Sequence, residues 1–539
     1  MKRRDIQLLA AARQGDPDAC CELGRRYLHG SDGFPRHQRT AIDYLCGPPV
    51  ADSPKAALIL AEGMSLVDII LTGNEASLRL AAVSGSRVAQ LKMAAWLLIR
   101  CGSTGESRAW LQVAAVAGND VALHALATLD RDGSAMIAAE MLTAHCAQSH
   151  ADVARLNTIA AEQAIERNDL SQAMKCLRAI VEAGSPPSDD LADLTLAVVH
   201  LADKCGHSVS DLSTAWIESC LASASDRGER NANYLLGRAL CGISSGSLAA
   251  HQLTRHSNVR QGSALLMRAA HGGIDAAWLH LYRLHAEPRS SVANLPIARV
   301  FLEKSAHRGC SEAQRMLGAL LMSECTDLSK SERAIAWLHQ AAHAGDRHSA
   351  ALLESLVVRP TGSDAEANAI VDEVSRHEPL LAARLQLARH FGLTKREALL
   401  VNPATGMRPW GLVVERNPFV EQPRLAAPRA IPSLSELALS TLQQAASMFK
   451  RLGQEDAAAG DWRYRTKRMR WSLNRYRVVE SLFFAEISSH TLEALRGGPK
   501  WRSRCRRELE AAIEPADVDL RFDYSIAERP THGSMRSTV

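Results

Sequence analysis

The chain has 539 residues, of which 46% are hydrophobic and only 4% aromatic, and its formal net charge is +4. Such a length usually means several globular domains, and a net charge this small says little about partners. No uninterrupted apolar stretch of about 18 residues occurs, and the basic start lacks the sustained apolar core of a signal peptide. The sequence therefore predicts neither a transmembrane helix nor a signal peptide.

The first predicted element at the N-terminus is a pair of helices that flank Gly15. Leu8 and Ala12 precede this glycine and Ala19 and Leu23 follow it, at intervals typical of helices rather than strands. The same frame returns at Gly85, Gly118, Gly184, Gly228, Gly273, Gly309 and Gly345, and with another residue in place of the glycine at Asp52, Ser149 and Glu378. Glycine suits a helix end because it enters the left-handed backbone region without a clash of a Cβ atom.

The frame is most regular at residues 262–353, where Gly273, Gly309 and Gly345 follow one another at intervals of 36 residues. A fixed period of this size indicates a repeat array. Each repeat is predicted to be two helices with the glycine between repeats, and about eleven repeats span residues 5 to roughly 390. A repeat this short cannot bury its apolar side alone, so the repeats must stack on one another.

Three phrases in these repeats resemble the Sel-one-like repeat family, a relative of the tetratricopeptide repeat. They are the start ACCELGRRYLHG at 19–30, the phrase A-I-x-W/Y-L at 41–45 and 334–338, and the A-A-x-x-G end of the repeats. The resemblance covers about 70% of the chain, is strongest at 262–353 and is good at 8–45. It implies an α/α solenoid that binds other proteins and assembles complexes, and it implies no catalytic residues.

The twelve cysteines favour a reducing compartment. Secreted members of the resembled family carry paired cysteines that recur in each repeat, whereas no repeat of this chain shows such a pair. Cys176 and Cys220 share the core position eight residues before the frame glycine, and Cys101 and Cys325 share the position sixteen residues after it. Free cysteines behave as small buried apolar residues. We therefore expect twelve free thiols and a cytoplasmic location.

Histidine stands two residues before the glycine in three successive repeats, at His271, His307 and His343. His339 precedes His343 by one helical turn, which is also a spacing of metal ligands. Equivalent positions of stacked repeats lie about 8–10 Å apart, too far to share a zinc ion with bonds of about 2 Å. We therefore interpret these histidines as helix C-terminal residues that interact favourably with the helix dipole, and we predict no metal or cofactor.

Three short phrases look like catalytic motifs but lack the context that catalysis requires. GISSG at 242–246 matches G-x-S-x-G, yet that motif follows a strand, and here a helix of the array is predicted before it. SMFK at 447–450 lacks the companion motifs of the S-x-x-K enzymes, and HEPLL at 377–381 lacks the second histidine of a zinc-binding helix. The sequence therefore predicts no enzyme.

The helical periodicity stops after His390. Residues 391–432 hold six prolines, and proline both removes a hydrogen-bond donor and disrupts a helix interior. We expect an extended segment here, with one short hairpin around WGLVV, that caps the last repeats. A helix is then predicted from Ser433, with Glu436 completing a capping box, to about Leu452.

The sharpest feature outside the repeats is a basic segment at 460–507. It holds 13 Lys or Arg against 4 Asp or Glu, a net charge of +9, whereas the rest of the chain is at −5. Apolar residues recur at helical spacing, so a helix is predicted to bury one side and expose its basic residues. The predicted buried side is Met469, Leu473, Tyr476, Val479 and Phe483. The candidate polyanion-binding residues are Arg463, Arg465, Lys467, Arg468, Arg470, Arg475, Arg477, Lys500, Arg502 and Arg504.

This segment is compatible with several partners. Aromatic residues are interleaved with the basic ones, and that combination binds single-stranded nucleic acid. A basic helix also lies on an anionic membrane or an acidic protein. The alternatives without a partner are a solvated face with the aromatics in the core, or docking of the segment on the acidic repeats. If a partner binds, we expect one electropositive surface at the end of the solenoid.

Together these patterns predict an all-α protein in four parts: an α/α solenoid at 1–390, a Pro-rich extended segment or cap at 391–432, a helical basic region at 433–514 and a partly disordered tail at 515–539. The favoured function is a non-catalytic scaffold or adaptor that binds a protein or peptide partner on the solenoid surface. The second alternative is a nucleic-acid-associated regulator that uses the basic region, and the third is an enzyme domain within 391–539.

Overall fold

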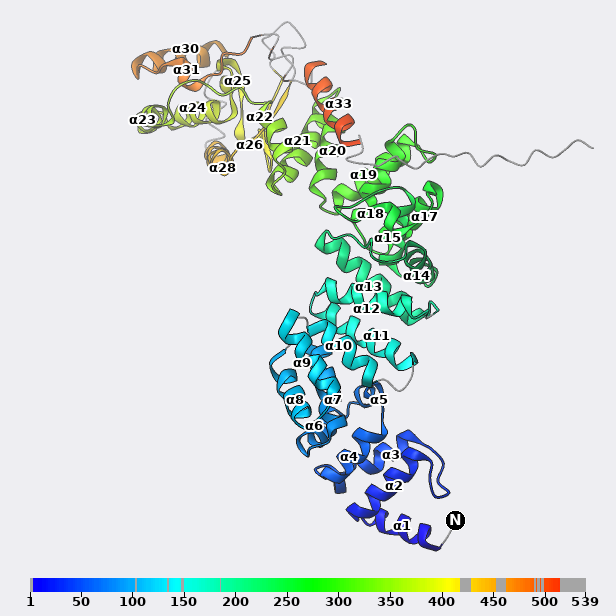
Figure 1. Cartoon of the computed structure of the whole chain (residues 1–539). Helices are drawn as coiled ribbons and strands as arrows, with labels where there is room; N and C mark the ends of the chain where they lie inside the picture. The colour runs from blue at the N-terminus through cyan, green and yellow to red at the C-terminus, as the bar shows by residue number, and fades with distance from the viewer. Residues whose placement is uncertain are drawn as a thin grey trace, which may run out of the picture. The chain divides into compact units, whose positions relative to one another are not determined.

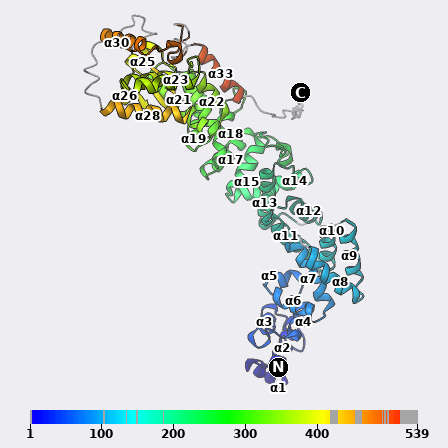
Figure 2. The same cartoon turned by 90° about the vertical axis from the view of Figure 1, so that its left-hand side faces the viewer.

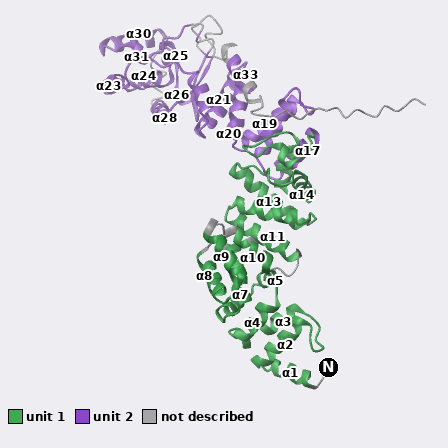
Figure 3. Ribbon diagram, viewed as in Figure 1, with its two compact units in different colours: residues 1–258 green, residues 259–539 purple. Residues whose placement is uncertain are grey.

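The computed structural model describes residues 3–101, 104–132, 135–146, 150–184, 186–416, 428–451, 462–488, 491, 495 and 499–513. The chain divides into two compact units, unit 1 at Met1–Asn258 and unit 2 at Val259–Val539 (Figure 3). Successive helices make up most of both units (Figures 1 and 2). The all-α class predicted from the repeats is confirmed.

Unit 1 consists of helices joined by turns and loops. They are α1 (Arg3–Arg13), α2 (Pro17–His29), α3 (Gln38–Leu45), the 3-10 helix η1 (Pro48–Val50), α4 (Pro54–Gly63), α5 (Leu66–Leu71), α6 (Glu75–Val83), α7 (Arg87–Cys101), α8 (Thr104–Val116), α9 (Asp120–Asp132), α10 (Ala135–Cys146), α11 (His150–Glu166), α12 (Leu170–Glu182), α13 (Asp189–Cys205), α14 (Thr214–Asp226), α15 (Arg230–Leu240) and α16 (Ala250–Leu253).

Unit 2 continues the helical pattern and adds a small sheet. Its helices are α17 (Val259–His271), α18 (Ala276–Ala286), α19 (Leu295–His307), α20 (Ser311–Ser323), α21 (Leu328–His343), α22 (Arg347–Glu354), α23 (Asp364–Ser375), α24 (Pro379–Phe391), α25 (Lys395–Leu400), α26 (Pro403–Gly406), α28 (Glu436–Arg451), α30 (Trp462–Arg475), α31 (Glu480–Phe483) and α33 (Pro499–Ile513). Its strands are β1 (Met407–Arg408), β2 (Gly411–Val414) and β3 (Arg429–Pro432).

The eight frame glycines lie in short turns between consecutive helices, as the sequence predicts. All eight have a positive φ, from +71° at Gly184 to +95° at Gly85 and Gly273. At Gly309 an added Cβ atom would meet open space, yet φ is +90°. Glycine is therefore required at this turn by the left-handed backbone and not by crowding.

The weaker repeats are joined without glycine where the structure describes them. Asp52 lies in the turn before α4, and Glu378 directly precedes α24, while Ser149 falls outside the described residues. Among the turns that the frame misses is the one between α11 and α12, where Asn168 takes a φ of +57°. Asparagine is one of the few residues other than glycine that enters the left-handed region readily. This turn therefore has the same left-handed backbone as the glycine turns, although the glycine is absent.

Small residues let neighbouring helices approach closely. A Cβ atom added to Gly24 of α2 would lie 2.4 Å from Cγ of Leu45 in α3, and one added to Gly318 of α20 would lie 2.7 Å from Cγ of Leu338 in α21. Both glycines stand at the same place in the predicted frame, nine residues after the frame glycine. The leucine of the next helix occupies the space that a side chain would need, so the sequence frame also describes a packing position.

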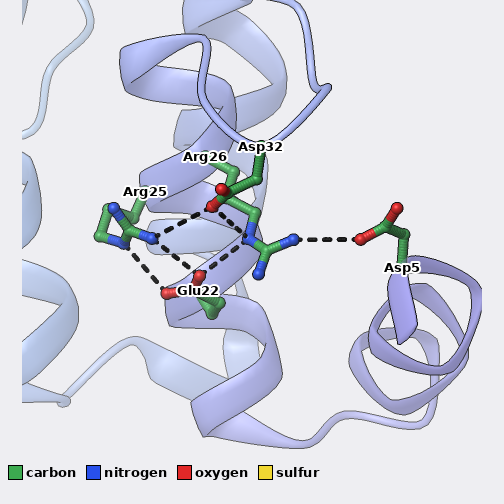
Figure 4. A network of polar contacts seen from close by, with 5 residues as sticks. All are labelled: Asp5, Glu22, Arg25, Arg26 and Asp32. Carbon is green, nitrogen blue, oxygen red and sulfur yellow. Dashed lines mark hydrogen bonds and ion pairs between the residues drawn. The ribbon is translucent and has the colours of Figure 1, made fainter. Parts of the chain in front are cut away.

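A polar network ties the first two helices of unit 1 together (Figure 4). Oε1 of Glu22 lies 2.8 Å from Nη2 of Arg25 and 2.8 Å from Nε of Arg26. Arg26 also reaches α1, with 3.2 Å between its Nη1 and Oδ1 of Asp5, and the loop after α2, with 3.5 Å between its Nε and Oδ2 of Asp32. Hydrogen bonds from Arg25, and then from Arg26, lower the pKa of Glu22 to about 2.

Residues 391–432, which we expected to be extended, begin instead with the short helices α25 and α26. The expected hairpin is present, because β1 pairs antiparallel with β2 around WGLVV, and β3 then pairs antiparallel with the other edge of β2. The prolines did not prevent α25 and α26, since Pro403 stands in the first turn of α26, where its missing N–H costs nothing.

The core of unit 2 runs across residue 390 without interruption. One cluster of buried apolar side chains joins Val371 of α23 and Leu385 of α24 to Leu412 of β2, Leu442 of α28 and Leu473 of α30. The sheet and the helices that follow it are therefore packed into the same core as the last helical pair of the array. The boundary that we predict at residue 390 separates sequence patterns and not packed layers.

The next helix starts later than the sequence suggests. We predicted that it begins at Ser433 with Glu436 completing a capping box. In the structure α28 begins at Glu436, and the hydroxyl of Ser435 accepts from the backbone N–H of Ala438 at 3.1 Å. Ser433 instead donates to the backbone oxygen of Ser435 at 2.8 Å. The capping box prediction at this helix is therefore wrong, because a second serine two residues later has the better position.

Candidate functional site

The predicted column of histidines ends three helices of unit 2. His271 ends α17 and His307 ends α19, and their Nδ1 atoms lie 2.8 Å and 2.7 Å from the backbone oxygens of Met267 and Glu303. Because a carbonyl oxygen only accepts, each ring donates its N–H to the backbone carbonyl one turn before it in its own helix. His343 ends α21 in the same frame position. These histidines thus lie where the helix dipole favours them.

Tryptophan side chains lie beside two of these histidines. The ring centroids of His271 and Trp278 are 5.2 Å apart, and those of His307 and Trp337 are 5.0 Å apart, both edge to face. Trp278 is buried and Trp337 is half-buried. The second pair therefore presents an aromatic surface at the junction of α19 and α21.

This junction opens into two cavities. One cavity, of about 500 Å³, lies over α19 to α21, and a second, also of about 500 Å³, lies between α21, α22 and the start of α28. His339 and His343 line both. The first cavity is completed by Ala306, His307, Gly309, Gln314, Trp337, Gln340 and Ala344. The second is completed by Ala342, Ala350, Leu353, Glu354, Ser433, Leu434, Ser435, Glu436, Leu439, Ser440 and Gln443.

The electrostatics of the shared wall favour a neutral imidazole. Burial, and then the neighbouring His343, lower the pKa of His339 below its ordinary value. His339 is therefore neutral at neutral pH and can both donate and accept a hydrogen bond. Within the described part of the chain, no three His, Cys, Asp or Glu side chains come together as ligands for a metal ion.

The first half of the basic segment forms α30, which packs on the end of the array. Met469 and Leu473 are each 3% exposed and join the core of unit 2. Between them, the hydroxyl of Ser472 donates to the carboxylate of Glu378, with 2.9 Å to each oxygen. The ring of Tyr476 stacks on His377, with 6.5 Å between the centroids. The predicted helix with one buried side is thus present.

The buried side ends differently from the prediction. We expected Val479 on it, but Val479 is 51% exposed and Val478 is 9% exposed. The reason is that α30 stops at Arg475 and Arg477 turns into the left-handed region with a φ of +50°. The N–H of Val478 then bonds the backbone oxygen of Leu473 at 2.9 Å, which is the closure of a Schellman motif. The prediction that Val479 is buried was wrong, because the residue that ends the helix is an arginine and not the glycine that usually marks such an end.

Seven candidate polyanion-binding residues belong to α30 and the turn after it. Arg463, Lys467, Arg468, Arg470, Arg475 and Arg477 are exposed, and Arg465 is half-buried. Tyr464 and Trp471, which lie between them, are 53% and 56% exposed. The guanidinium carbon of Arg475 lies 5.1 Å from the ring centroid of Trp471. Basic and aromatic groups therefore share one solvent-facing side of α30.

The second half of the basic segment lies on another helix. Arg502 is exposed and Arg504 half-buried on α33, which also contains Lys500, whose side chain lies outside the described residues. Helix α33 packs on α20, with Cys505 fully buried and Oε2 of Glu508 3.6 Å from Nη1 of Arg315. The basic residues of 460–507 are thus divided between α30 and α33 and do not form the one surface that we expected.

The motif-like phrases have structural roles. Within GISSG, which follows helix α15, the hydroxyl of Ser244 accepts from the N–H of Ala250 at the start of α16, at 3.2 Å. Ser447 of SMFK lies in α28 and donates to the backbone oxygen of Gln444 at 2.8 Å. In HEPLL, Glu378 accepts from Ser472. Sequence reasoning missed both cavities, and the walls of the second come from helices that are far apart in the chain.

No protein-family model matches the chain, and no curated protein matches its sequence. The chain is similar to solved Sel1-like repeat proteins. One is a protective antigen of uropathogenic Escherichia coli that displays an SLR fold, with 16% identity, a TM-score of 0.32, and 93% of this chain and 96% of the antigen covered.

The other is a Sel1 repeat protein from Oxalobacter formigenes, with 20% identity, a TM-score of 0.23, and 66% of this chain and 91% of the neighbour covered. At such identities and scores, the fold class of this chain rests on its own helices and turn glycines. Among the described helices, none is long and apolar enough to cross a membrane.

Proposed function

We propose that the chain is a non-catalytic scaffold or adaptor that binds a protein or peptide partner on the repeat surface formed by α19 to α22. The observation that carries the proposal is the pair of cavities that share His339 and His343. Each measures about 500 Å³, which is within the range of sites that enclose a small group of ligand atoms. A peptide that crosses this surface would place one side chain in each cavity.

The cavity walls suit apolar or aromatic side chains of a partner. Trp337 stands in the first cavity, and Leu353 and Leu439 stand in the second, with alanines between them. Tryptophan is among the residues that contribute most of the binding energy at protein interfaces. The neutral imidazole of His339 adds a group that donates and accepts hydrogen bonds at the shared wall, and such groups fix the orientation of a bound chain.

The contacts of the serines support a non-catalytic role. In the second cavity the hydroxyl of Ser440 donates to the backbone oxygen of Leu437 at 2.9 Å, so this hydroxyl is engaged with its own helix rather than with a base. A serine–histidine contact occurs elsewhere, with 3.2 Å between Oγ of Ser263 and Nε2 of His285. Ser263 is only 8% exposed, and neither residue lines the two cavities.

We also propose a cytoplasmic location. Eleven cysteines whose side chains are described are free thiols, and the twelfth, Cys101, has a side chain outside the described set. Cys176 and Cys220 are 7% and 0% exposed, as expected for core residues of the frame. Many unpaired thiols in a helical array are typical of proteins kept in a reducing environment.

The proposal is tested by filling the second cavity. Ala350 lines that cavity and is half-buried, so Ala350→Phe places a ring in it without replacing a core side chain. The matched control is Ala276→Phe, because Ala276 is exposed on α18 and lines neither cavity. Each full-length variant is used as affinity bait in the cell of origin, and the captured proteins are quantified by mass spectrometry.

We expect at least one protein that the parent chain and the Ala276→Phe variant capture equally and that the Ala350→Phe variant loses. Thermal unfolding of the three proteins should be the same, which shows that the loss is not caused by misfolding. If every captured protein is retained by the Ala350→Phe variant, the cavities are not the binding surface and the proposal fails.

A further inference from the structure

One side of α30 carries an alternation of aromatic and basic residues that faces solvent. Tyr464, Lys467, Arg468, Trp471 and Arg475 stand at positions i, i+3, i+4, i+7 and i+11 of the helix. This spacing places them on a single face. Tyr464 and Trp471 are 53% and 56% exposed, and the three basic residues are exposed as well. Helix α30 lies at the edge of unit 2 in both views (Figures 1 and 2).

The opposite side of α30 is buried in the core of unit 2. Met469 and Leu473 are each 3% exposed in the core, and Ser472 is fully buried against Glu378. Large aromatic side chains are costly to leave in water, and they contribute little to folding when half of their surface stays exposed. With about half of their surface in water, Tyr464 and Trp471 offer an aromatic surface on this side of α30.

The charge of the stripe is not neutralised within the described part of the protein. No carboxylate described in the structure lies within 4.0 Å of the charged nitrogens of Lys467, Arg468 or Arg475. Arg475 instead sits over Trp471, with 5.1 Å from its guanidinium carbon to the ring centroid. This cation–π contact orients the indole ring and leaves the positive charge available.

We propose that this face of α30 binds single-stranded nucleic acid. Bases would stack on Tyr464 and Trp471, which lie about 10 Å apart along the helix axis because seven residues separate them. Lys467, Arg468 and Arg475 would neutralise the phosphates that connect the bases. A positively charged track with aromatic rings at intervals is the arrangement by which proteins hold single strands without sequence preference.

Other polyanions fit the face less well. A basic helix that lies on an anionic membrane inserts its apolar side among the lipids, but the apolar side of α30 is occupied by the core of unit 2. An acidic peptide would neutralise the charge and leave the two rings without a partner. A single strand supplies both phosphates and stacking surfaces, so it is the partner that accounts for all five residues of the stripe.

The experiment is fluorescence anisotropy of the full chain with dye-labelled oligothymidine and oligouridine. We expect binding that weakens steeply with salt, because each neutralised phosphate releases a counterion. Trp471→Ala and Tyr464→Ala should each weaken binding about tenfold, while Trp471→Phe keeps most of it because phenylalanine also stacks. The double variant Lys467→Glu, Arg468→Glu should lower both the affinity and its salt dependence. Comparing the two oligonucleotides shows whether the strand is DNA or RNA.

The matched control for charge is Arg506→Glu with Arg507→Glu, which makes the same change in net charge at exposed positions of α33. This control should bind like the parent chain, and all variants should keep the parent helicity and melting temperature. The proposal is overturned if Trp471→Ala binds like the parent chain, if the α33 control loses binding equally, or if blunt duplex DNA binds as well as the single strand. Binding to anionic vesicles without binding to either oligonucleotide would overturn it too.

Discussion

Arg429 and Glu397 form an ion pair in the interior of unit 2. Nη1 of Arg429 lies 3.3 Å from Oε2 of Glu397, and the two side chains are 1% and 5% exposed. The arginine also donates to the backbone oxygen of Leu356 at 3.2 Å, and the glutamate accepts from the N–H of Thr394 in a capping box. One buried pair thereby connects strand β3, the start of α25 and the segment after α22.

Breaking this pair should be strongly destabilising, because one charge then stays buried without a partner. We expect Arg429→Met to lower the free energy of unfolding of unit 2 by about 3–5 kcal/mol. Adding Glu397→Gln in the same chain should recover part of the loss, since the remaining charge is removed. Urea unfolding followed by circular dichroism measures both changes.

The matched control is the pair Arg283–Glu312, whose nitrogen and oxygen lie 2.6 Å apart but whose side chains are 37% and 36% exposed. Arg283→Met should change the free energy of unfolding by less than about 1 kcal/mol, because solvent screens such a pair. Equal losses for Arg283→Met and Arg429→Met would show that burial does not control the contribution of these pairs.

Two glycines of neighbouring repeats should respond to substitution for different reasons. Gly309→Ala forces a side chain into a left-handed conformation and should cost about 1–2 kcal/mol, whereas Gly309→Asn should cost less because asparagine tolerates that region. Gly318→Ala keeps an ordinary helical backbone but pushes a Cβ atom against Leu338 and should cost about 1–3 kcal/mol. Thermal unfolding of the three variants gives the comparison.

A double-mutant cycle distinguishes the two causes. Gly318→Ala combined with Leu338→Ala should lose less than the sum of the single variants, because the smaller side chain makes room for the new Cβ atom. Gly309→Ala combined with Leu338→Ala should be additive, since an added Cβ at Gly309 contacts nothing within 4 Å. An additive result at Gly318 would contradict the close approach of α20 and α21.

Acid should weaken the connection between α1 and α2. The pKa of Glu22 is lowered to about 2 in the folded chain by hydrogen bonds from Arg25 and then Arg26. A lowered folded pKa means that the carboxylate stabilises the fold above its unfolded pKa, and that this stabilisation is lost as the pH falls through about 4.5 toward 2. The melting-temperature difference between the parent chain and Glu22→Gln should therefore be largest near pH 6 and shrink steadily below pH 4.5.

A carboxylate outside the network provides the control. Glu354 takes part in no ion pair among the described residues, so Glu354→Gln removes a carboxylate without disturbing such a network. A Glu22→Gln difference that stays constant down to pH 2 would mean that the network holds α1 to α2 by packing and not by charge.

The thiols should react in the order of their burial. Cys205 is exposed, whereas burial raises the pKa of Cys146 to about 11 and that of Cys241 to about 12. Alkylation proceeds through the thiolate, so brief treatment of the folded chain should modify Cys205 first. In denaturant without a reducing agent, peptide mass spectrometry should find twelve alkylated cysteines, and a disulfide-linked peptide pair would refute both the free-thiol prediction and the proposed location.

The array was predictable from the sequence because its signal is local. A left-handed turn such as that at Gly309 needs glycine or asparagine whatever surrounds it, so each turn leaves a mark at a fixed interval. Leu338, which faces Gly318, likewise lies in the next helix of the chain. These constraints act within about one helical pair, and a period of 36 residues makes them readable.

The candidate surfaces were less predictable because they depend on contacts between distant segments. His339 and Leu439 line the second cavity together although they are 100 residues apart in the chain. No spacing in the sequence indicates that α28 will close this cavity. The division of the basic segment follows from the docking of α33 on α20, which lies far upstream. By contrast, the capping box of Thr394 and Glu397 has a local signature, T-x-x-E, although we did not predict it.

Helical repeats normally allow a chain to lengthen or shorten by whole repeats, since each repeat contacts only its neighbours. The core that α23 and α24 share with the sheet, α28 and α30 removes this freedom at one end. Duplication or deletion of a repeat upstream of α17 would leave that core intact, whereas any change between α23 and α30 would have to replace several elements at once. We therefore expect the upstream repeats to tolerate a change of repeat number, and the block from α23 to α30 to tolerate none.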